Sequence, residues 1–512
     1  ASQWYEQHGL VEEAIGHALS AKDVETAVRL VGEHAPGLLG QGRIVELLNL
    51  ANRLPEALVH ARPRLCVLVG MALALVGQPE ASESYLQSAE GSLTSVPQPD
   101  SQILQGQIAA ARASIAAERA DAVRTIEYAR QALLRLPHSD PFTRGLAAFN
   151  LGDAYLLTGE VVPASAAFTD AVDLSLATGS LHMVTLSSAY LARTEMLRGR
   201  LRKAERVCQR ALGLVAELSE APERMVPTVG MLYAYLGHLR RELDDLDGAG
   251  SYLGQALEVG EQSRYVEILT ATYRALAQLH RARAHVQAGL AMIERAIETV
   301  RNDGLTAMRR LLLAERADLL VALARLEDAE RWAREHRVGE VDDFGLPNER
   351  ECLSLSRLRL ARGEAAQAVK LLARLLGPAE TAGRFGVVIE ILALQAMALG
   401  ESGKLEPALR SLERALALAE PEGYVRTFAD YGEPMAALLR QVAARGTAPR
   451  YVARLLAAVT SPGRSAGEPA TGHATASGQG STMFQNGVEA LTAREVEVLR
   501  LLSGGASNQR IA

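Results

Sequence analysis

Small and apolar residues recur along the chain at the spacing of two packed helices. In LGDAYLLTGEVVPASAAFTDAVDL they fall at Gly152, Tyr155, Ala164, Phe168 and Ala171, where an antiparallel helix pair would make contact. The same spacing recurs in later units, at Ala192, Ala204, Cys208 and Ala211, at Gly237, Ala249, Leu253 and Ala256, and at Ala396, Ala408, Leu412 and Ala415. The pattern predicts a repeated helix pair with a period of roughly 40 residues.

A short turn separates the two helices of each predicted pair. The turn residues are Gly159, Gly199, Asp244, Ala284, Ala324, Gly363 and Gly403. One helix of each pair carries a small residue where its partner crosses, namely Ala164, Ala204, Ala249, Gly289, Ala329, Ala368 and Ala408. Because one pair cannot bury its apolar stripe alone, neighbouring pairs must stack. We therefore expect an all-α fold, a tetratricopeptide-like α-solenoid built as a right-handed superhelix of helix pairs.

The pattern changes twice towards the end of the chain. The repeats are predicted over residues 1–458, and they end in a cap with a helix-stopping Pro421, the aromatic residues Tyr424, Phe428 and Tyr431, and a new helix near Pro434. Residues 459–489 are rich in Gly, Ser and Thr and lack an apolar period, which predicts a flexible linker. A helical pattern returns over residues 490–512.

Composition narrows the class of protein and its location. Hydrophobic residues make up 48% of the chain but aromatic residues only 4%, which favours helices packed through small side chains. A net charge of -6 gives the bulk of the chain no electrostatic footprint for nucleic acid. The odd number of scattered cysteines, Cys66, Cys208 and Cys352, predicts buried thiols in a reducing compartment.

No segment of the sequence points to a membrane or to export. The most apolar run, residues 65–77, is shorter than the ~20 residues that cross a bilayer, and no export signal opens the chain. We therefore expect a cytoplasmic protein with no membrane partner. The first residues contain no initiator Met and have the pattern of an internal helical segment, so we expect that further residues precede them.

The last 22 residues begin a second kind of helical unit. The T-A-R-E sequence at residues 492–495 is a capping box that precedes apolar residues at helical spacing, and Ser507 can cap a second helix after a Gly-Gly turn. LTAREVEVLRLLSGGASNQRIA resembles the opening of the LuxR-type helix-turn-helix DNA-binding domain, with Arg510 where the family pattern has Glu. The resemblance implies phosphate contacts by Thr492, Ser507 and Asn508. The family's recognition helix would follow these residues, so we expect residues 1–512 alone to show no sequence-specific DNA binding.

Three further stretches resemble the MalT-like large ATP-binding regulators of the LuxR family. These stretches are WYEQHGLVEEAIGHAL, LPEALVHARPRLCVLVGMALALVGQPEAS and LALAEPEGYVRTFADYGEPMAALL. The resemblance implies a superhelical sensor that binds an inducer or a regulatory protein, a parent protein that binds DNA, and self-association on activation. It also implies that ATP is bound only by an upstream domain. An alternative is a tetratricopeptide scaffold for protein-protein interaction that is unrelated to transcription.

The sequence contains no pattern for catalysis or cofactor binding. It lacks the G-x-x-x-x-G-K-[ST] loop that holds nucleotide phosphates, and it lacks the H-E-x-x-H and G-x-S-x-G patterns and any Cys/His cluster. We therefore expect this chain to be no enzyme and to hold neither ATP nor a metal ion.

One column of polar residues is the candidate binding site. In tetratricopeptide arrays the first helix of each pair lines the inner surface, and the residue after its small position faces the groove. That column reads Asp153, Arg193, His238, Gln278, Asp318, Arg357 and Met397. With Arg241 and Arg281 one turn onward, its polar members form a candidate inducer or partner site, since converging polar groups in a concave surface orient a ligand. The simpler alternative is a row of solvated side chains, and His238, His280 and His285 are expected to be surface or packed residues rather than sensors.

Overall fold

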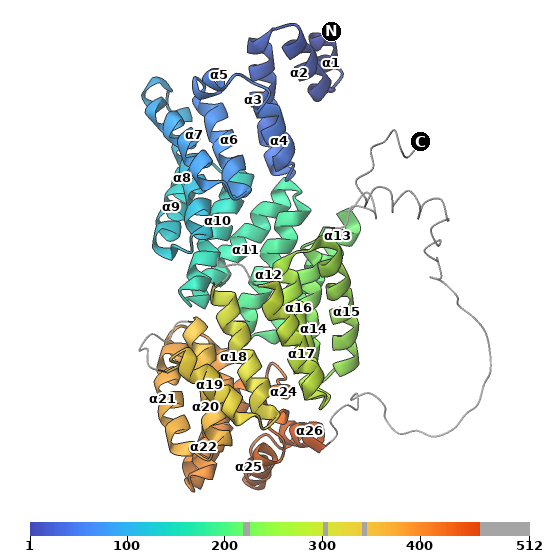
Figure 1. Ribbon diagram of the computed structural model, residues 1–512, viewed down its shortest axis with the longest axis vertical. Coiled ribbons are helices and arrows are strands. Elements are labelled where there is room, and N and C mark those ends of the chain that lie inside the picture. Colours follow the sequence, from blue (N-terminus) through green and yellow to red (C-terminus); the bar gives the residue numbers. More distant parts are fainter. Residues whose placement is uncertain (219–225, 301–305, 340–345, 461–512) are drawn as a thin grey trace, which may run out of the picture. The chain divides into compact units, whose positions relative to one another are not determined.

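The computed structural model describes residues 1–218, 226–300, 306–339 and 346–460, and every regular element in these ranges is a helix (Figure 1). The predicted all-α fold is therefore confirmed. The N-terminal helices are α1 (Ser2–Gln7), α2 (Val11–Ser20), α3 (Val24–Gly40), α4 (Ile44–Ala51), α5 (Glu56–His60), α6 (Pro63–Leu75), α7 (Pro79–Gly91), the short 3-10 helix η1 (Leu93–Ser95), α8 (Asp100–Glu118) and α9 (Ala122–Arg135).

Helix pairs of similar length then follow one another. They are α10 (Pro141–Leu157) and α11 (Val161–Thr178), α12 (Leu181–Leu197) and α13 (Leu201–Leu218), α14 (Val229–Glu242) and α15 (Leu246–Ser263), α16 (Val266–Ala282) and α17 (Val286–Thr299), α18 (Thr306–Ala322) and α19 (Leu326–Glu335), α20 (Leu346–Ala361) and α21 (Ala365–Thr381), and α22 (Phe385–Glu401) and α23 (Leu405–Ala419). The chain continues through α24 (Arg426–Ala429), α25 (Glu433–Ala444) and α26 (Pro449–Thr460). Consecutive α-helices from α6 to α23 pack on each other, which is the expected tetratricopeptide-like α-solenoid.

The turn inside each pair has the same backbone conformation in all the repeats. All seven predicted turn residues adopt the left-handed region, with φ between 56° and 83°. At the first of them, the N–H of Gly159 bonds the carbonyl of Leu156 at 3.1 Å, and the N–H of Glu160 bonds the carbonyl of Tyr155 at 2.8 Å. This is the hydrogen-bond pattern that ends a helix with a left-handed residue. The predicted turn positions are confirmed.

The left-handed turns make a matched pair of stability predictions. Ala324 and Gly363 occupy the same turn position, at φ 56° and 76°, and a side chain at Gly363 would meet nothing within 4 Å. Because this region costs a residue with a Cβ about 1–2 kcal/mol, Gly363→Ala should destabilise the protein by about 1 kcal/mol. Ala324→Gly should stabilise it by up to about 1 kcal/mol, after the added flexibility of glycine is counted. Chemical denaturation of the two variants checks both signs, and the same sign for both would contradict the argument.

The small residues predicted at the helix crossings lie at points of close approach. Ala164, Ala204, Ala249, Ala329, Ala368 and Ala408 are all fully buried. A Cβ on Gly289 would come within 2.9 Å of the Ala277 carbonyl oxygen, and a Cβ on Gly237 within 2.5 Å of the Leu253 side chain. Larger side chains at these crossings would separate the helices, since protein interiors leave no spare volume.

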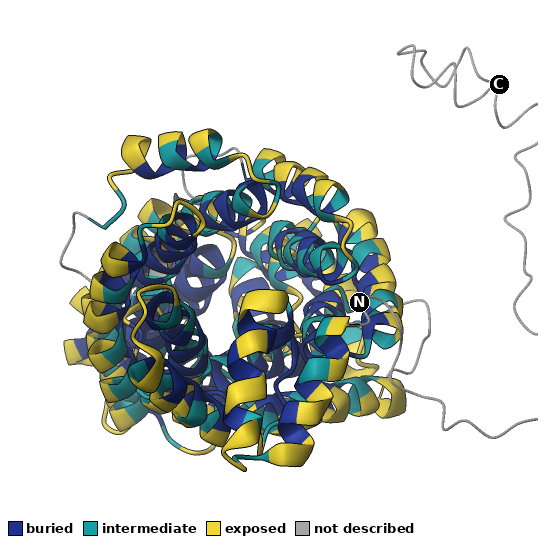
Figure 2. Ribbon diagram, turned by 90° about the horizontal axis from the view of Figure 1, so that it is seen from below, coloured by how far each residue is buried: buried dark blue, intermediate teal, exposed yellow. Residues whose placement is uncertain are grey.

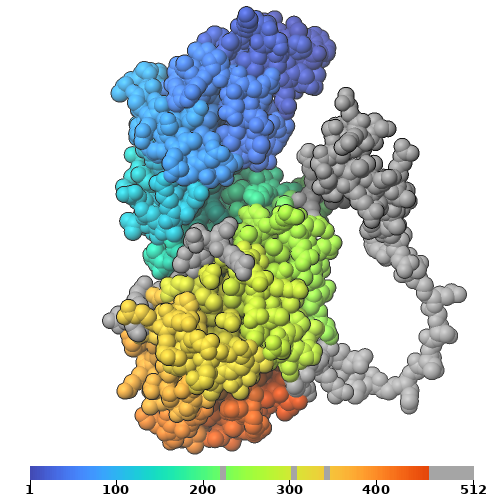
Figure 3. All heavy atoms as spheres, viewed as in Figure 1, coloured from blue at the N-terminus to red at the C-terminus, as the bar shows by residue number. Residues whose placement is uncertain are grey.

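Stacking of the pairs produces one large core and several smaller ones. The largest buried apolar cluster includes residues from 189 to 458, smaller clusters lie at α10 to α12 and at α15 and α16, and another over residues 14–73 serves the first helices. Figure 3 shows the successive segments of residues 1–460 stacked in sequence order from blue to red. The three cysteines are buried thiols without disulfides, as predicted. None of the described helices is both long and apolar enough to span a bilayer.

The predicted cap does more than cover the last pair. Residues 422–431, which include α24 and which we call the closing segment, turn back onto the end of α14, about half-way along the array. The N–H of Val425 bonds the Glu242 carbonyl at 3.0 Å, and the N–H of Thr427 bonds Glu242 Oε1 at 2.7 Å. Beyond the segment, Arg454 Nη2 donates to the Leu243 carbonyl at 2.9 Å. The superhelix is thereby closed into a ring.

A second contact closes the ring between α22 and α12. Arg384, at the start of α22, donates through Nη1 to the carbonyl oxygen of Gly159 at 3.2 Å and pairs with Glu349 at 2.7 Å. A Cβ on Gly386 would come within 2.5 Å of the Met196 carbonyl oxygen, so the two backbones touch. Figure 2 looks along the ring, with buried residues gathered on its inner helices and exposed residues on the outside.

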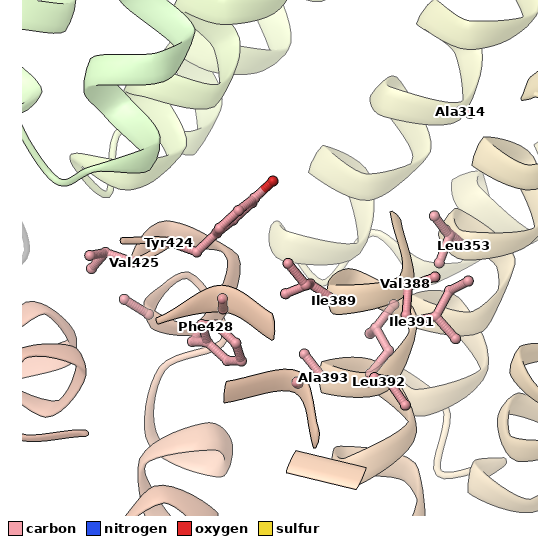
Figure 4. Close-up of a cluster of buried hydrophobic side chains, with 14 of the residues drawn as sticks. Ala314, Leu353, Val388, Ile389, Ile391, Leu392, Ala393, Tyr424, Val425 and Phe428 are labelled. Carbon is pink, nitrogen blue, oxygen red and sulfur yellow. The ribbon is translucent and has the colours of Figure 1, made fainter. Parts of the chain in front are cut away.

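Aromatic residues of the closing segment join it to the core. Phe428 and Val425 are fully buried, and in Figure 4 Phe428 lies on the same level as Ile389 and Leu392 of α22 while Val425 points away from them. The Tyr424 and Phe428 side chains leave the backbone in opposite directions in that view. The predicted aromatic cap is therefore confirmed, and the new helix predicted near Pro434 is α25. The predicted linker and DNA-binding fragment lie outside the described residues, except for residues 459 and 460 at the end of α26.

Candidate ligand-binding cavity

The ring encloses a cavity of about 620 Å³. The first helix of each pair from α10 to α22 contributes side chains to its wall, and the closing segment and the first residue of α13, Leu201, complete it. The expectation that the first helices form the inner surface is therefore confirmed. A volume of this size is in the range of cavities that bind small molecules.

Most residues of the predicted column lie around this one cavity. Those that line it are Asp153, Arg193, His238, Arg241, Gln278, Arg281 and Arg357. Asp318 does not line it, because two arginines of the next inner helix lie over its carboxylate: Arg350 at 2.7 Å and Arg357 at 3.1 Å. Met397 is half-buried and packs against the core. The repeat period thus identified the right faces of the helices, while the ion pairs decided which side chains stay accessible.

Charged residues from three consecutive inner helices form a network on one wall. Arg350 Nη1 lies 3.1 Å from Glu390 Oε1, and Arg357 bonds both Glu390 and the hydroxyl of Tyr431, the latter at 3.3 Å. Burial opposes ionisation of Glu390, but Arg357 and Arg350 outweigh it and lower the pKa of Glu390 to about 2. With Asp318, these residues hold α18, α20, α22 and the closing segment at fixed positions.

A second group of polar residues surrounds Tyr190 at the part of the cavity formed by α10, α12 and α16. Asp153, Arg193, Tyr235 and Glu267 all act electrostatically on the Tyr190 hydroxyl, so they lie near one another. Burial raises the pKa of Asp153, and Arg193 opposes that shift. Among the described residues, neither Asp153 nor Arg193 makes a hydrogen bond or a close ion pair.

His238 is a packed histidine of the cavity wall, which is one of the two placements expected from the sequence. Burial, together with the positive charges of Arg241 and Arg274, lowers the pKa of His238 to about 3. It is therefore neutral at physiological pH and can serve as a hydrogen-bond donor or acceptor to a ligand, but not as a pH sensor. Burial likewise lowers the pKa of His280, and His285 caps α17 outside the cavity.

The contribution of the closing segment to the cavity was not predicted from the sequence. Its residues that line the cavity are Tyr424, Arg426, Thr427, Asp430 and Tyr431. Their aromatic cluster was recognised as a cap, yet no period relates them to the column, because they lie outside the repeats. Within the described residues no group of three His, Cys, Asp or Glu side chains could hold a metal ion. Thr492, Ser507 and Asn508 lie outside the described part of the chain.

The geometry defines a class of protein: a tetratricopeptide-like superhelix that closes around a cavity lined by both charged and apolar side chains. The sequence model of the MalT-like TPR region family matches residues 106–445, and the chain belongs to that family. The matched range covers the pairs from α10 to α23 and the closing segment.

Curated relatives match a shorter stretch. The serine/threonine-protein kinase PknK of Mycobacterium tuberculosis strain H37Rv is 33% identical over 93 residues, which are 18% of this chain and 8% of the kinase. PknK of Mycobacterium bovis gives the same values. The chain therefore matches less than a tenth of the length of these relatives.

Solved structures with the same kind of helical repeat include regulators and an ATPase. A Rap protein complexed with Competence and Sporulation Factor shares 12% identity, with 81% of this chain and 98% of that chain covered, at a TM-score of 0.41. The apo quorum sensor NprR from B. thuringiensis shares 13%, covers 69% and 97%, and has a TM-score of 0.45. A STAND protein with a tetratricopeptide repeat sensor from Pyrococcus horikoshii shares 14%, covers 80% and 63%, and has a TM-score of 0.39. These likenesses are too distant to carry an argument about function.

Proposed function

We propose that this chain is the signal-sensing region of a MalT-like, LuxR-family transcriptional regulator, and that the central cavity is its inducer site. The observation that carries the proposal is the cavity itself: inner helices from seven pairs converge on about 620 Å³ that contains charged and hydrogen-bonding side chains. Converging polar groups of this kind fix the orientation of a bound molecule.

Occupancy of the cavity has a physical route to the C-terminal end of the chain. The closing segment forms part of the cavity wall and is followed directly by α25 and α26, after which the LuxR-like sequence begins at residue 491. A ligand that contacts Tyr424 or Thr427 would favour one position of the closing segment over others. Differential contact of this kind is what couples binding to a conformational equilibrium. We propose that DNA binding by the complete regulator is controlled in this way.

Native mass spectrometry tests the inducer site directly. The full chain is incubated with the low-mass fraction of an extract of the cells that produce it, and the increase in its mass is measured. We expect one added small molecule per chain, and we expect the double variant Arg193→Ala, His238→Ala to lose at least about nine-tenths of it, since each residue offers the ligand a polar contact. Arg440→Ala, an exposed site on α25, is the control that should retain the ligand. Equal occupancy in the double variant would place the ligand elsewhere and refute the proposal.

Control of transcription needs a separate measurement in cells. When the complete parent regulator drives a reporter gene, the Arg193→Ala, His238→Ala variant should lose induction while keeping its protein level. If the variant still responds to inducer, ligand binding in the cavity does not control transcription. The scaffold alternative would be favoured by two results together: the parent protein affects no reporter gene, and this chain binds other proteins.

A further inference from the structure

The charged side chains of the cavity divide into those that have a partner and those that do not. Arg274 is held by Glu315 at 2.6 Å, and the other paired arginines of the wall are likewise held by carboxylates. Among the described residues that line the cavity, Arg193, Arg281, Asp153 and Glu267 make no hydrogen bond or close ion pair. A charge left without a partner in a recessed site is costly, and a ligand group of opposite sign would remove that cost. These four side chains are therefore the ones available to a ligand.

The four available charges are separated by sign along the cavity. Glu267 lies in the first turn of α16 and Arg281 in its last turn, about 21 Å apart along the helix axis. Asp153, Arg193 and Glu267 lie together around Tyr190, so that end carries one negative charge in excess. Arg281 lies at the other end, close enough to Tyr431 to act on its hydroxyl. One end of the cavity is thus suited to a cation and the other to an anion.

The wall between these two ends offers both hydrogen bonds and apolar surface. Thr270 Oγ1 is buried and without a hydrogen-bond partner among the described residues, and the Gln278 side chain interacts with His238; both residues belong to α16 and line the cavity. Met231, Met308 and Leu353 line the same cavity from α14, α18 and α20. Methionine side chains adapt to ligands of varied shape. The middle of the cavity therefore suits a chain that alternates amide groups with side chains.

From this arrangement we infer that the cavity binds a short peptide in an extended conformation, with its free α-amino group at Asp153 and Glu267 and its free carboxylate at Arg281. An extended chain of five residues spans about 17 Å, and the inward reach of the glutamate and arginine side chains supplies the remaining length. Arg193 balances the second acidic group at the amino end. This inference rests on the proposed inducer site and specifies the chemistry of its ligand.

Peptide pools with blocked ends test the two charge contacts separately. The full chain is mixed with a pool of random pentapeptides with free ends, with the same pool acetylated at the N-terminus, or with the same pool amidated at the C-terminus. Peptides that stay with the protein through gel filtration are measured by mass spectrometry. We expect at least about tenfold more retained peptide from the free pool than from either blocked pool, because each blocking group removes a charge-assisted contact.

Substitutions at one end of the cavity should abolish one preference at a time. Arg281→Gln should retain free and amidated peptides equally, while its preference for a free amino end persists. The double variant Asp153→Asn, Glu267→Gln should retain free and acetylated peptides equally, while its preference for a free carboxylate persists. Each preference is a ratio measured within one variant, so a partial loss of folded protein leaves it unchanged, and Arg440→Gln should behave as the unaltered chain.

The outcomes distinguish this inference from the proposed inducer site. Retention of no peptide, or equal retention from all three pools, overturns the peptide inference. If a non-peptide molecule from the cell extract then still binds in a manner that depends on Arg193, the inducer site stands and only its ligand class is wrong. If neither peptides nor extract components bind, both proposals fail.

Discussion

Replacing Arg426 by Ala should lower the free energy of unfolding by about 3–5 kcal/mol, because it leaves the buried carboxylate of Asp244 without its close cation, while Asp430 keeps Arg241. Arg426 is 3% exposed and lies 2.5 Å from Asp244 and 3.6 Å from Asp430, joining the closing segment to the end of α14. Urea denaturation of the full chain measures the change. The matched control is Arg440→Ala, whose ion pair with Glu433 is exposed and should be worth less than about 1 kcal/mol.

The loss in Arg426→Ala should depend on pH in a defined direction. Burial already raises the pKa of Asp244, and Arg426 opposes that shift, so the pKa should rise further in the variant. A carboxyl whose folded pKa exceeds its unfolded value binds protons more tightly in the folded state, so stability is regained as the pH falls. The difference between variant and parent should therefore be smaller at pH 5 than at pH 7.5. If the difference in unfolding free energy instead grows as the pH falls, the destabilisation does not come from the unpaired Asp244 carboxylate.

Gly386→Ala should destabilise the ring by about 1–3 kcal/mol, although alanine is a better helix former than glycine. The added Cβ would come within 2.5 Å of the Met196 carbonyl oxygen and 3.2 Å of that of Leu197, and a backbone cannot turn aside as a side chain can. The start of α22 must then move away from the end of α12. Thermal unfolding followed by circular dichroism measures the effect.

A second glycine of the same helix supplies the control. A Cβ on Gly400 would make only an ordinary contact of 3.4 Å with Leu438, so Gly400→Ala should be neutral or stabilising by up to about 1 kcal/mol. Helix propensity acts on both positions in the same direction, and only the approach of α12 differs. If both variants gain stability, α22 and α12 do not touch in solution as described.

The local parts of this fold could be predicted because the repeat imposes them. Each turn needs a left-handed residue and each crossing needs a small one, so Gly159 or Ala164 can be recognised from spacing alone. Closure of the ring could not be predicted in this way. It depends on Glu242 meeting Val425, residues that belong to no common period and lie several helix pairs apart along the array. Neither local propensity nor hydrophobic spacing carries information about such a contact.

The candidate binding site could likewise be predicted only in part. The period placed Asp153, Arg193 and His238 on the inner face, because side chains at equivalent repeat positions must face the same way. It could not show that Asp318 would be covered, since that depends on two long arginine side chains of the following repeat. Nor could it show that His238 would stay neutral, which results from burial and from neighbours on other helices.

Closure of the ring has a consequence for how the molecule comes apart. In an open stack of repeats each end can peel away on its own, since a unit contacts only its neighbours. Here the closing segment cannot leave without exposing the end of α14 to water. Amide protons of Val425 and Thr427 should therefore exchange with solvent as slowly as those in the middle of the array, although they lie close to the end of the described helices.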